Sequence, residues 1–112
     1  MEVEIHWSTL AKQQLKEVAQ YVAENFGERT AIKCLDRISK KVDRLYLFPE
    51  SGSYDKKYST EHYIVRHLVL HPNLVYYIQQ ENRITVMAVV HERQSPKTIS
   101  EMIHRFVEHH LG

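Results

Sequence analysis

The 112-residue chain has one cysteine, three glycines, three prolines and no long apolar run. Cys34 has no partner for an internal disulfide, which fits the reducing cytoplasm. With so few glycines, a loop that cradles phosphates is not expected, and neither is a nucleotide cofactor. No stretch approaches the ~18 apolar residues of a membrane helix, and the N-terminus lacks the basic-then-apolar form of a signal peptide. We therefore expect a cytoplasmic protein with no membrane partner.

The chain also lacks a charge excess of either sign. Fifteen Lys and Arg face 14 Asp and Glu, so the formal net charge is only +1. The whole molecule therefore has no strong field to attract a polyanion, although a local basic patch remains open. The hydrophobic content of 43% is that of a globular protein. The length predicts a single domain over residues 1–112.

Two amphipathic helices are predicted after a short N-terminal strand. Residues 3–7 alternate apolar and polar, and Ser8 and Thr9 then offer helix N-caps. Gly27 ends the first helix, a link of about three residues follows, and Pro49 stops the second. So short a link requires the helices to pack antiparallel. Their apolar stripes are Ala11, Leu15, Val18, Val22 and Phe26, then Ala31, Leu35, Ile38, Val42 and Leu45.

Three antiparallel strands follow, at about 63–70, 74–80 and 83–91, and a short edge strand is expected near Lys57. In the last strand Ile84, Val86, Ala88 and Val90 are predicted on one face, and Met87 and Val89 on the other. The helical hairpin can cover only one of these apolar faces. The fold class is therefore α+β, ordered β-α-α-β-β-β, with a helical hairpin packed on a mainly antiparallel sheet.

An additional helix is predicted at the C-terminus, where Ser95 and Pro96 suit an N-cap and a first turn. This extension, residues 97–111, would either dock on the open face of the sheet or bind a partner. Its apolar stripe comprises Ile99, Met102, Ile103, Phe106, Val107 and Leu111.

The end of the last strand brings ionisable residues to a rigid rim. RNA cleavage needs a proton acceptor, a proton donor and a cation for the developing phosphorane charge. His91, Glu92, Arg93 and, on a neighbouring strand, Arg66 could supply these roles. The alternative is that His91 caps the strand and the arginines meet an acidic partner or solvent.

Three other groups of residues have a structural explanation beside a functional one. The second helix has a basic face that, with Lys56 and Lys57, could follow phosphates or simply be solvated; it comprises Lys33, Arg37, Lys40, Lys41 and Arg44. The tyrosines of the strands could stack on bases or pack in the sheet; they are Tyr63, Tyr76 and Tyr77. Ligands at one chain end do not close a metal site, so neither a metal nor a cofactor is expected from His104, Glu108, His109 and His110.

A family resemblance emerges from the order and spacing of many weak signals between residues 3 and 96. They are Trp7 before a helix with Ala11, Leu15 and Tyr21; Ala31; Leu45-x-x-x-Pro49-x-x-Gly52; Arg66; Tyr76-Tyr77-Ile78; Ile84-x-Val86; and Val89-Val90-His91-x-Arg93. Together they resemble the RelE/ParE superfamily of bacterial toxins from type II toxin–antitoxin systems. The likeness is greatest to the ParE, or plasmid-stabilisation, branch.

The resemblance implies a cognate antitoxin whose C-terminal segment wraps the toxin and neutralises it. ParE-like members poison DNA gyrase by binding it, whereas RelE-like members cleave mRNA in the ribosomal A site. This chain has Gln94, Ser95 and Pro96 where RelE-like toxins have a catalytic tyrosine, and its charge is low for a nuclease of the ribosome. We therefore expect a gyrase-binding toxin. The alternatives are a ribosome-dependent endoribonuclease using His91, Arg66 and Arg93, and a non-toxic interaction scaffold.

The resemblance also suggests which residues contact the antitoxin. Arg66 and Arg93 would receive acidic antitoxin side chains, because guanidinium and carboxylate groups pair in a defined geometry. His91 would lie on the rim of the functional surface, and Tyr63 and Tyr77 would belong to the partner-binding surface. The helix over 97–111 could occupy part of the antitoxin groove. The sequence leaves open whether two copies form a homodimer.

Overall fold

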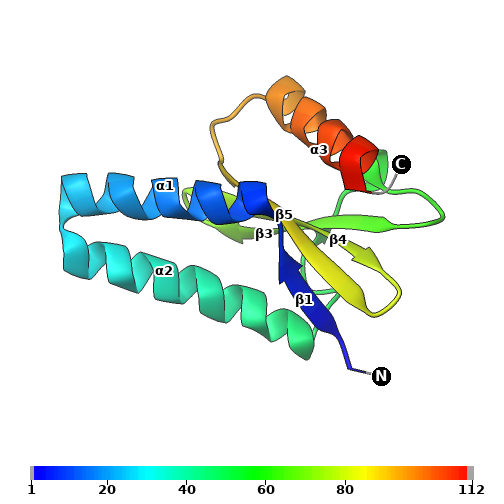
Figure 1. Cartoon of the computed structure of the whole chain (residues 1–112), viewed down its shortest axis with the longest axis horizontal. Helices are drawn as coiled ribbons and strands as arrows, with labels where there is room; N and C mark the ends of the chain where they lie inside the picture. The colour runs from blue at the N-terminus through cyan, green and yellow to red at the C-terminus, as the bar shows by residue number, and fades with distance from the viewer. Residues whose placement is uncertain (1, 111–112) are drawn as a thin grey trace.

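The computed structural model describes residues 2–110, which form one five-stranded sheet with helices on both faces (Figure 1). The strand order is β1-β5-β4-β3-β2; β1 runs parallel to β5, and every other pair is antiparallel. The strands are β1 Glu4–Trp7, β2 Ser53–Tyr54, β3 Ile64–Leu70, β4 Asn73–Gln80 and β5 Arg83–His91. The helices are α1 Thr9–Phe26, α2 Glu28–Asp43 and α3 Pro96–His110. The predicted α+β fold is confirmed.

The helical hairpin begins and turns at residues that the sequence singled out. The Ser8 hydroxyl accepts a hydrogen bond from the Ala11 amide at 3.0 Å, as an N-cap does. Gly27 alone joins α1 to α2, where a link of about three residues was predicted. Its φ of +94° explains the shorter link, because glycine adopts this conformation without a side-chain penalty and reverses the chain in one residue.

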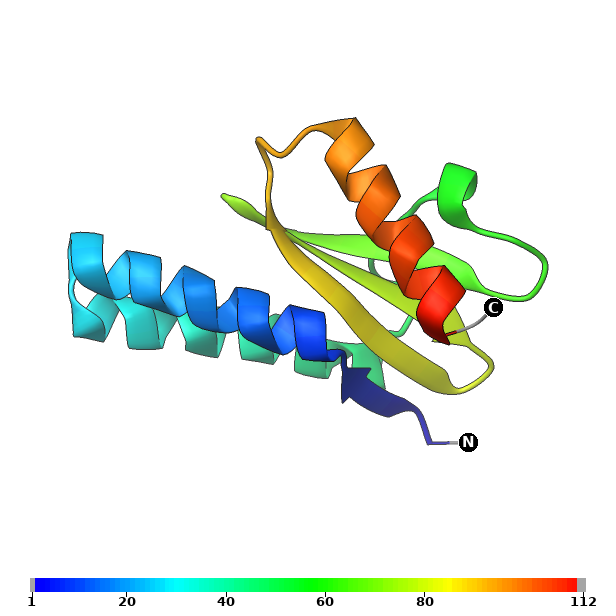
Figure 2. The same cartoon turned by 45° about the horizontal axis from the view of Figure 1, so that its top comes forward.

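Two apolar clusters lie on opposite faces of the sheet. The first packs α1 and α2 on one face, around residues such as Ile38 and Val42, which are at most 1% exposed. The second packs α3 on the other face through Ile99, Ile103 and Phe106. Figure 2 shows α3 lying across the strands. Of the two roles predicted for the C-terminal helix, docking on the open sheet face is therefore the observed one; Leu111, the end of its expected stripe, lies outside the described residues.

A β-bulge in β5 changes which side chains face which helices. Tyr77 pairs with Val86 and Tyr76 pairs with Ala88, so Met87 is an extra residue in β5. The predicted alternation is correct as far as Met87 and wrong from Ala88 onward, because one extra residue reverses every later side chain. The hairpin face of β5 carries Ile84, Val86 and Val89, and the α3 face carries Met87, Ala88 and Val90.

A buried tyrosine, Tyr77, holds the loop before β2 through two hydrogen bonds of its hydroxyl. The Tyr77 hydroxyl donates to the Pro49 carbonyl at 2.8 Å and accepts from the Gly52 amide at 3.0 Å. A Cβ at Gly52 would lie 2.7 Å from the Tyr77 ring, so only glycine fits. This contact explains the Pro49-x-x-Gly52 part of the motif. The expected edge strand lies earlier than predicted, at Ser53–Tyr54, and Lys57 lies in a 3₁₀ turn.

Candidate functional site

A groove of about 970 Å³ lies between the helical hairpin and the end of β5; we call it the hairpin groove. Its helical wall comes from the distal half of α1 and the facing part of α2, and its floor from β5 and the β3–β4 turn. On α1, the apolar wall consists of Val18, Tyr21, Val22 and Phe26. Tyr21 and Phe26 are 62% and 64% exposed, so the groove presents aromatic surface to solvent.

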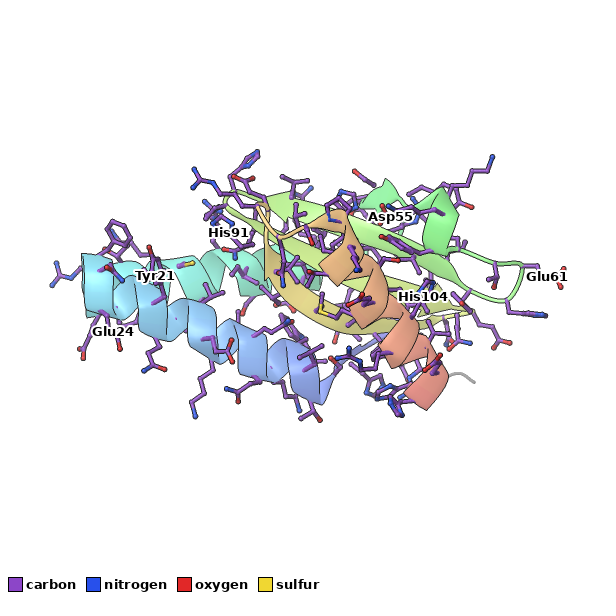
Figure 3. All side chains as sticks on the ribbon, turned by 90° about the horizontal axis from the view of Figure 1, so that it is seen from above. Tyr21, Glu24, Asp55, Glu61, His91 and His104 are labelled. Atoms are coloured by element: carbon purple, nitrogen blue, oxygen red, sulfur yellow. The ribbon has the colours of Figure 1, made fainter. Side chains whose placement is uncertain are left out.

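The groove exists because the hairpin starts partway along the sheet. β1 pairs with β5 only as far as Val86, and the chain enters α1 immediately afterwards, with the Ser8 amide donating to the Val86 carbonyl. An 18-residue helix extends about 27 Å, so its far half projects beyond the strands. Figure 1 shows this projection of α1 and α2. In Figure 3 Tyr21 lies on the projecting part of the hairpin, and His91 lies at the end of the sheet closer to that part.

The rim of the groove is polar, and its residues are hydrogen-bonded to one another. Arg37 of α2 donates to the His71 carbonyl at 2.8 Å. The His71 ring contacts the Glu92 carboxylate at 2.6 Å, and the Glu92 amide donates to the Pro72 carbonyl at 2.8 Å. These bonds join α2, the β3–β4 turn and the segment after β5. The Lys33 side chain also lines the groove and is exposed.

His91 lines the groove at the exposed end of β5. Its Nδ1 accepts a hydrogen bond from the Arg93 amide at 3.0 Å, and its carbonyl accepts from the Gln94 amide at 3.0 Å. An accepting Nδ1 leaves the ring proton on Nε2. The ring therefore caps the turn after the strand, which is the structural alternative considered for it above. Arg93 follows in the same turn and is exposed.

Arg66 lies far from the other three predicted nuclease residues. In the strand register Leu70 pairs with Asn73, which pairs with His91, and Arg66 lies four residues before Leu70. Strand spacings therefore put its Cα roughly 16 Å from that of His91. Arg66 instead donates to the Glu50 and Gly52 carbonyls at 3.3 and 3.1 Å. The four-residue constellation is not assembled, because Arg66 holds the loop before β2.

The two tyrosines expected at the partner surface lie elsewhere. Tyr77 is fully buried, and burial raises its pKa, opposed by the Gly52 amide and by the positive charge of Arg66. The prediction that Tyr77 contacts a partner is therefore wrong, because its side chain is part of the core. Tyr63 is half-buried against the α3 cluster, on the opposite face of the sheet from the hairpin groove.

A polar cluster on the α3 face was not predicted. His67 of β3 contacts the Asp55 carboxylate through Nδ1 at 2.9 Å, and both side chains are mostly buried. The Tyr76 ring lies 5.2 Å from the His67 ring. Burial, and then the Asp55 carboxylate, raise the pKa of Tyr76 to about 12. This cluster ties the segment after β2 to β3. Only the register of β2 against β3 brings Asp55 and His67 together, so no local sequence signal marks it.

Sequence reasoning identified His91 but not most of the groove. It assigned Tyr21 and Phe26 to the resemblance and to the apolar stripe, and it treated Arg37 as part of a basic face. One sequence feature could have indicated the groove: the apolar stripe of α1 is longer than the part of the sheet that can cover it. Among residues 2–110 no three metal-binding side chains are grouped for an ion. Nor is any helix in that range both long and apolar enough to cross a bilayer.

Comparison with known proteins agrees with this geometry. A family model described as the ParE toxin of the type II toxin–antitoxin system parDE matches residues 5–96. A search of curated proteins finds no match. A solved structure of the chromosomal ParDE toxin–antitoxin system from P. aeruginosa has a TM-score of 0.67 with 17% identity. That alignment covers 80% of this chain and 96% of the other, and it shows a shared fold.

The family match covers the hairpin, the sheet and the His91 end, and it stops where α3 begins. It therefore includes every element that forms the hairpin groove. The chain belongs to the ParE toxin family of type II toxin–antitoxin systems.

Proposed function

We propose that this toxin acts by binding a cellular protein, DNA gyrase, in the cytoplasm, and that a cognate antitoxin neutralises it by filling the hairpin groove. The proposed antitoxin site is supported by the groove itself, which has an exposed aromatic wall and a charged rim. The gyrase target rests on family membership.

The surface of the hairpin groove suits an amphipathic polypeptide with acidic residues. Tyr21 and Phe26 offer large, exposed rings of the kind that dominate binding energy in protein interfaces. Lys33 and Arg37 stand on the α2 side of the groove, and Glu17 stands on the α1 side. Carboxylates of a partner would pair with the two cations while its apolar side chains cover the aromatic wall. Arg93, exposed just beyond His91, extends the cationic rim.

The placement of the arginines supports binding over RNA cleavage. The Arg66 guanidinium is engaged with two backbone carbonyls, and its Cα lies roughly 16 Å from that of His91 by strand spacing. The Glu92 carboxylate is engaged with His71. A phosphoryl-transfer site needs its base and its cation around one phosphate, within hydrogen-bond reach. We therefore assign Arg66 to the loop and His91 to the rim of the groove.

The antitoxin site is tested by replacing Tyr21 and Phe26 with alanine. Both side chains are exposed, so folding should be retained while affinity for the cognate antitoxin falls about 10- to 100-fold. Ile32→Ala is the matched control, since Ile32 is 67% exposed but does not line the groove. Its affinity should change less than about 3-fold. Equal affinities for all three variants, measured by calorimetry, would place the antitoxin elsewhere.

The target is tested in two parallel assays. Purified toxin at micromolar concentration should inhibit supercoiling by gyrase and arrest growth when expressed without antitoxin. Absence of inhibition, together with A-site mRNA cleavage that is lost in His91→Ala, would replace the proposal with an endoribonuclease. Growth at the normal rate during expression would identify a non-toxic scaffold.

A further inference from the structure

The outer edge of β5 is only half covered by a neighbouring strand. β1 pairs with residues Arg83 to Val86, and α1 begins directly after β1. Within residues 2–110 no strand lies beside the second half of β5, from Met87 to His91, on this side. That half forms part of the floor of the hairpin groove. An uncovered strand edge is a template for pairing with another chain.

Side chains of the α1 N-cap and of α1 itself satisfy the first backbone groups of this uncovered edge. The Ser8 hydroxyl donates to the Met87 carbonyl at 2.8 Å. The Gln14 amide oxygen then accepts from the Val89 amide at 2.7 Å. Gln14 thus occupies the place that a carbonyl of a neighbouring strand would take. Its amide nitrogen is weakly held, 3.5 Å from the Met102 sulfur.

Among the described residues 2–110, no side chain bonds the next backbone groups on this edge. Successive residues of a strand direct their amides and carbonyls to alternate sides, so the Val89 carbonyl and the His91 amide follow the Val89 amide on the outer edge. The backbone amides and carbonyls of residues 88 and 90 instead point toward β4. Both Val89 and His91 line the hairpin groove. The groove therefore presents an ordered donor, acceptor and donor along one line.

We propose that the hairpin groove takes an extended segment of the antitoxin, which pairs with Val89 to His91 and continues the line of β1. The antitoxin segment would displace the Gln14 side chain from the Val89 amide when it binds. The inference rests on the proposed function, because it names the binding mode of the same groove. A helical occupant would bond its own backbone groups and would bury the Val89 carbonyl and the His91 amide without partners, which is costly. An extended segment satisfies both and lays alternate side chains against Tyr21 and Phe26.

The direct test is nuclear magnetic resonance of the full chain bound to its cognate antitoxin. A through-hydrogen-bond coupling between the His91 amide nitrogen and an antitoxin carbonyl carbon is expected. The binding segment of the antitoxin should also show the backbone carbon shifts of a strand. A complex without this coupling, with helical shifts over the binding segment, would overturn the inference.

A variant pair tests the role of Gln14 independently. Gln14→Ala removes the bond that the antitoxin must displace, so affinity should rise roughly 3- to 10-fold, as expected for one hydrogen bond. Gln20→Ala is the control, because Gln20 makes the same kind of side-chain bond, to Glu24 on the exposed face of α1, and neither residue lines the groove; its loss should change affinity less than about 2-fold. An unchanged or weaker affinity for Gln14→Ala would contradict the displacement.

Failure of the two proposals can be told apart. If Tyr21→Ala and Phe26→Ala weaken the complex but the coupling at His91 is absent, the groove is the antitoxin site and only strand pairing is wrong. If neither aromatic variant weakens the complex, the site itself is wrong, and strand pairing at the groove falls with it.

Discussion

The two faces of the sheet are covered in different ways. On one face the hairpin overshoots the strands and leaves a groove of about 970 Å³ between its distal half and the end of β5. On the other face α3 lies across the strands and buries Ile99, Ile103 and Phe106 to 7% exposure or less. The family match ends at residue 96, where α3 begins. The part of the chain that matches the family thus leaves the hairpin side of the sheet open, and α3 closes the opposite side.

Adjacent residues of β4 show the same contrast at atomic scale. Tyr77 points to the hairpin face, is fully buried and bonds Pro49 and Gly52 through its hydroxyl. Tyr76 points to the α3 face, packs near His67 and is 7% exposed. One tyrosine organises the loop before β2, and the other fills space beside a polar pair. This difference can be tested with single substitutions.

The largest expected effect comes from charging each core in turn. Ile38→Asp buries a carboxylate between the hairpin and the sheet, and we expect a loss of more than about 4 kcal/mol, enough to unfold most of the protein. Ile103→Asp should cost about 2–4 kcal/mol, because α3 can leave the sheet and take the new charge into water. Denaturant unfolding and limited proteolysis near residues 95–110 measure the two outcomes. Equal global unfolding by both variants would show a single cooperative core.

The next largest effect is expected at Gly52. An alanine Cβ would lie 2.7 Å from the Tyr77 ring, so the loop or the tyrosine must shift, at a cost of about 1–3 kcal/mol. Ser51→Ala is the control in the same loop, and its exposed side chain predicts a change within about 0.5 kcal/mol. Thermal unfolding of both variants checks this. An unaltered stability in Gly52→Ala would mean that the loop is not held against Tyr77.

Removing one hydroxyl from each tyrosine gives a smaller, matched comparison. Tyr77→Phe leaves the Gly52 amide and the Pro49 carbonyl without their shared partner, at an expected cost of about 1–3 kcal/mol. Tyr76→Phe removes no hydrogen bond seen within residues 2–110, and its effect should stay within about 0.5 kcal/mol. Free energies of unfolding in denaturant distinguish the two. Similar costs would mean that the bonds of the Tyr77 hydroxyl add no more stability than the Tyr76 hydroxyl does.

The smallest effect is a dependence of stability on alkaline pH. Burial raises the pKa of Tyr76 to about 12, whereas tyrosine in the unfolded chain titrates near 10. Between these values the unfolded chain loses a proton that the folded protein keeps, so the free energy of unfolding falls as pH rises. Below about pH 10 this contribution is complete. Tyr76→Phe should flatten the decline, and an identical pH profile for both proteins would contradict the assigned cause.

Local sequence signals predicted the elements well, and these are mostly set by short-range physics. Ser8 begins α1, Gly27 ends it and the apolar periods assign each helix and strand to within a few residues. The bulge at Met87 was not predicted, because Met87, Ala88 and Val89 are all apolar and suit either face. The site was predicted in part: His91 lies in the groove, but Arg66 and Tyr77 serve the loop before β2.

The sequence by itself determined the order of elements, the two apolar stripes of the hairpin and the family, because these depend on neighbouring residues and their spacing. Only the tertiary structure decided where α1 starts over β5, which residues of β5 remain uncovered and which arginine reaches the groove. Those features depend on strand register between segments about 80 positions apart, as in the Trp7–Val86 pair. A register set by the whole core, and not by local preference, therefore positions the candidate site.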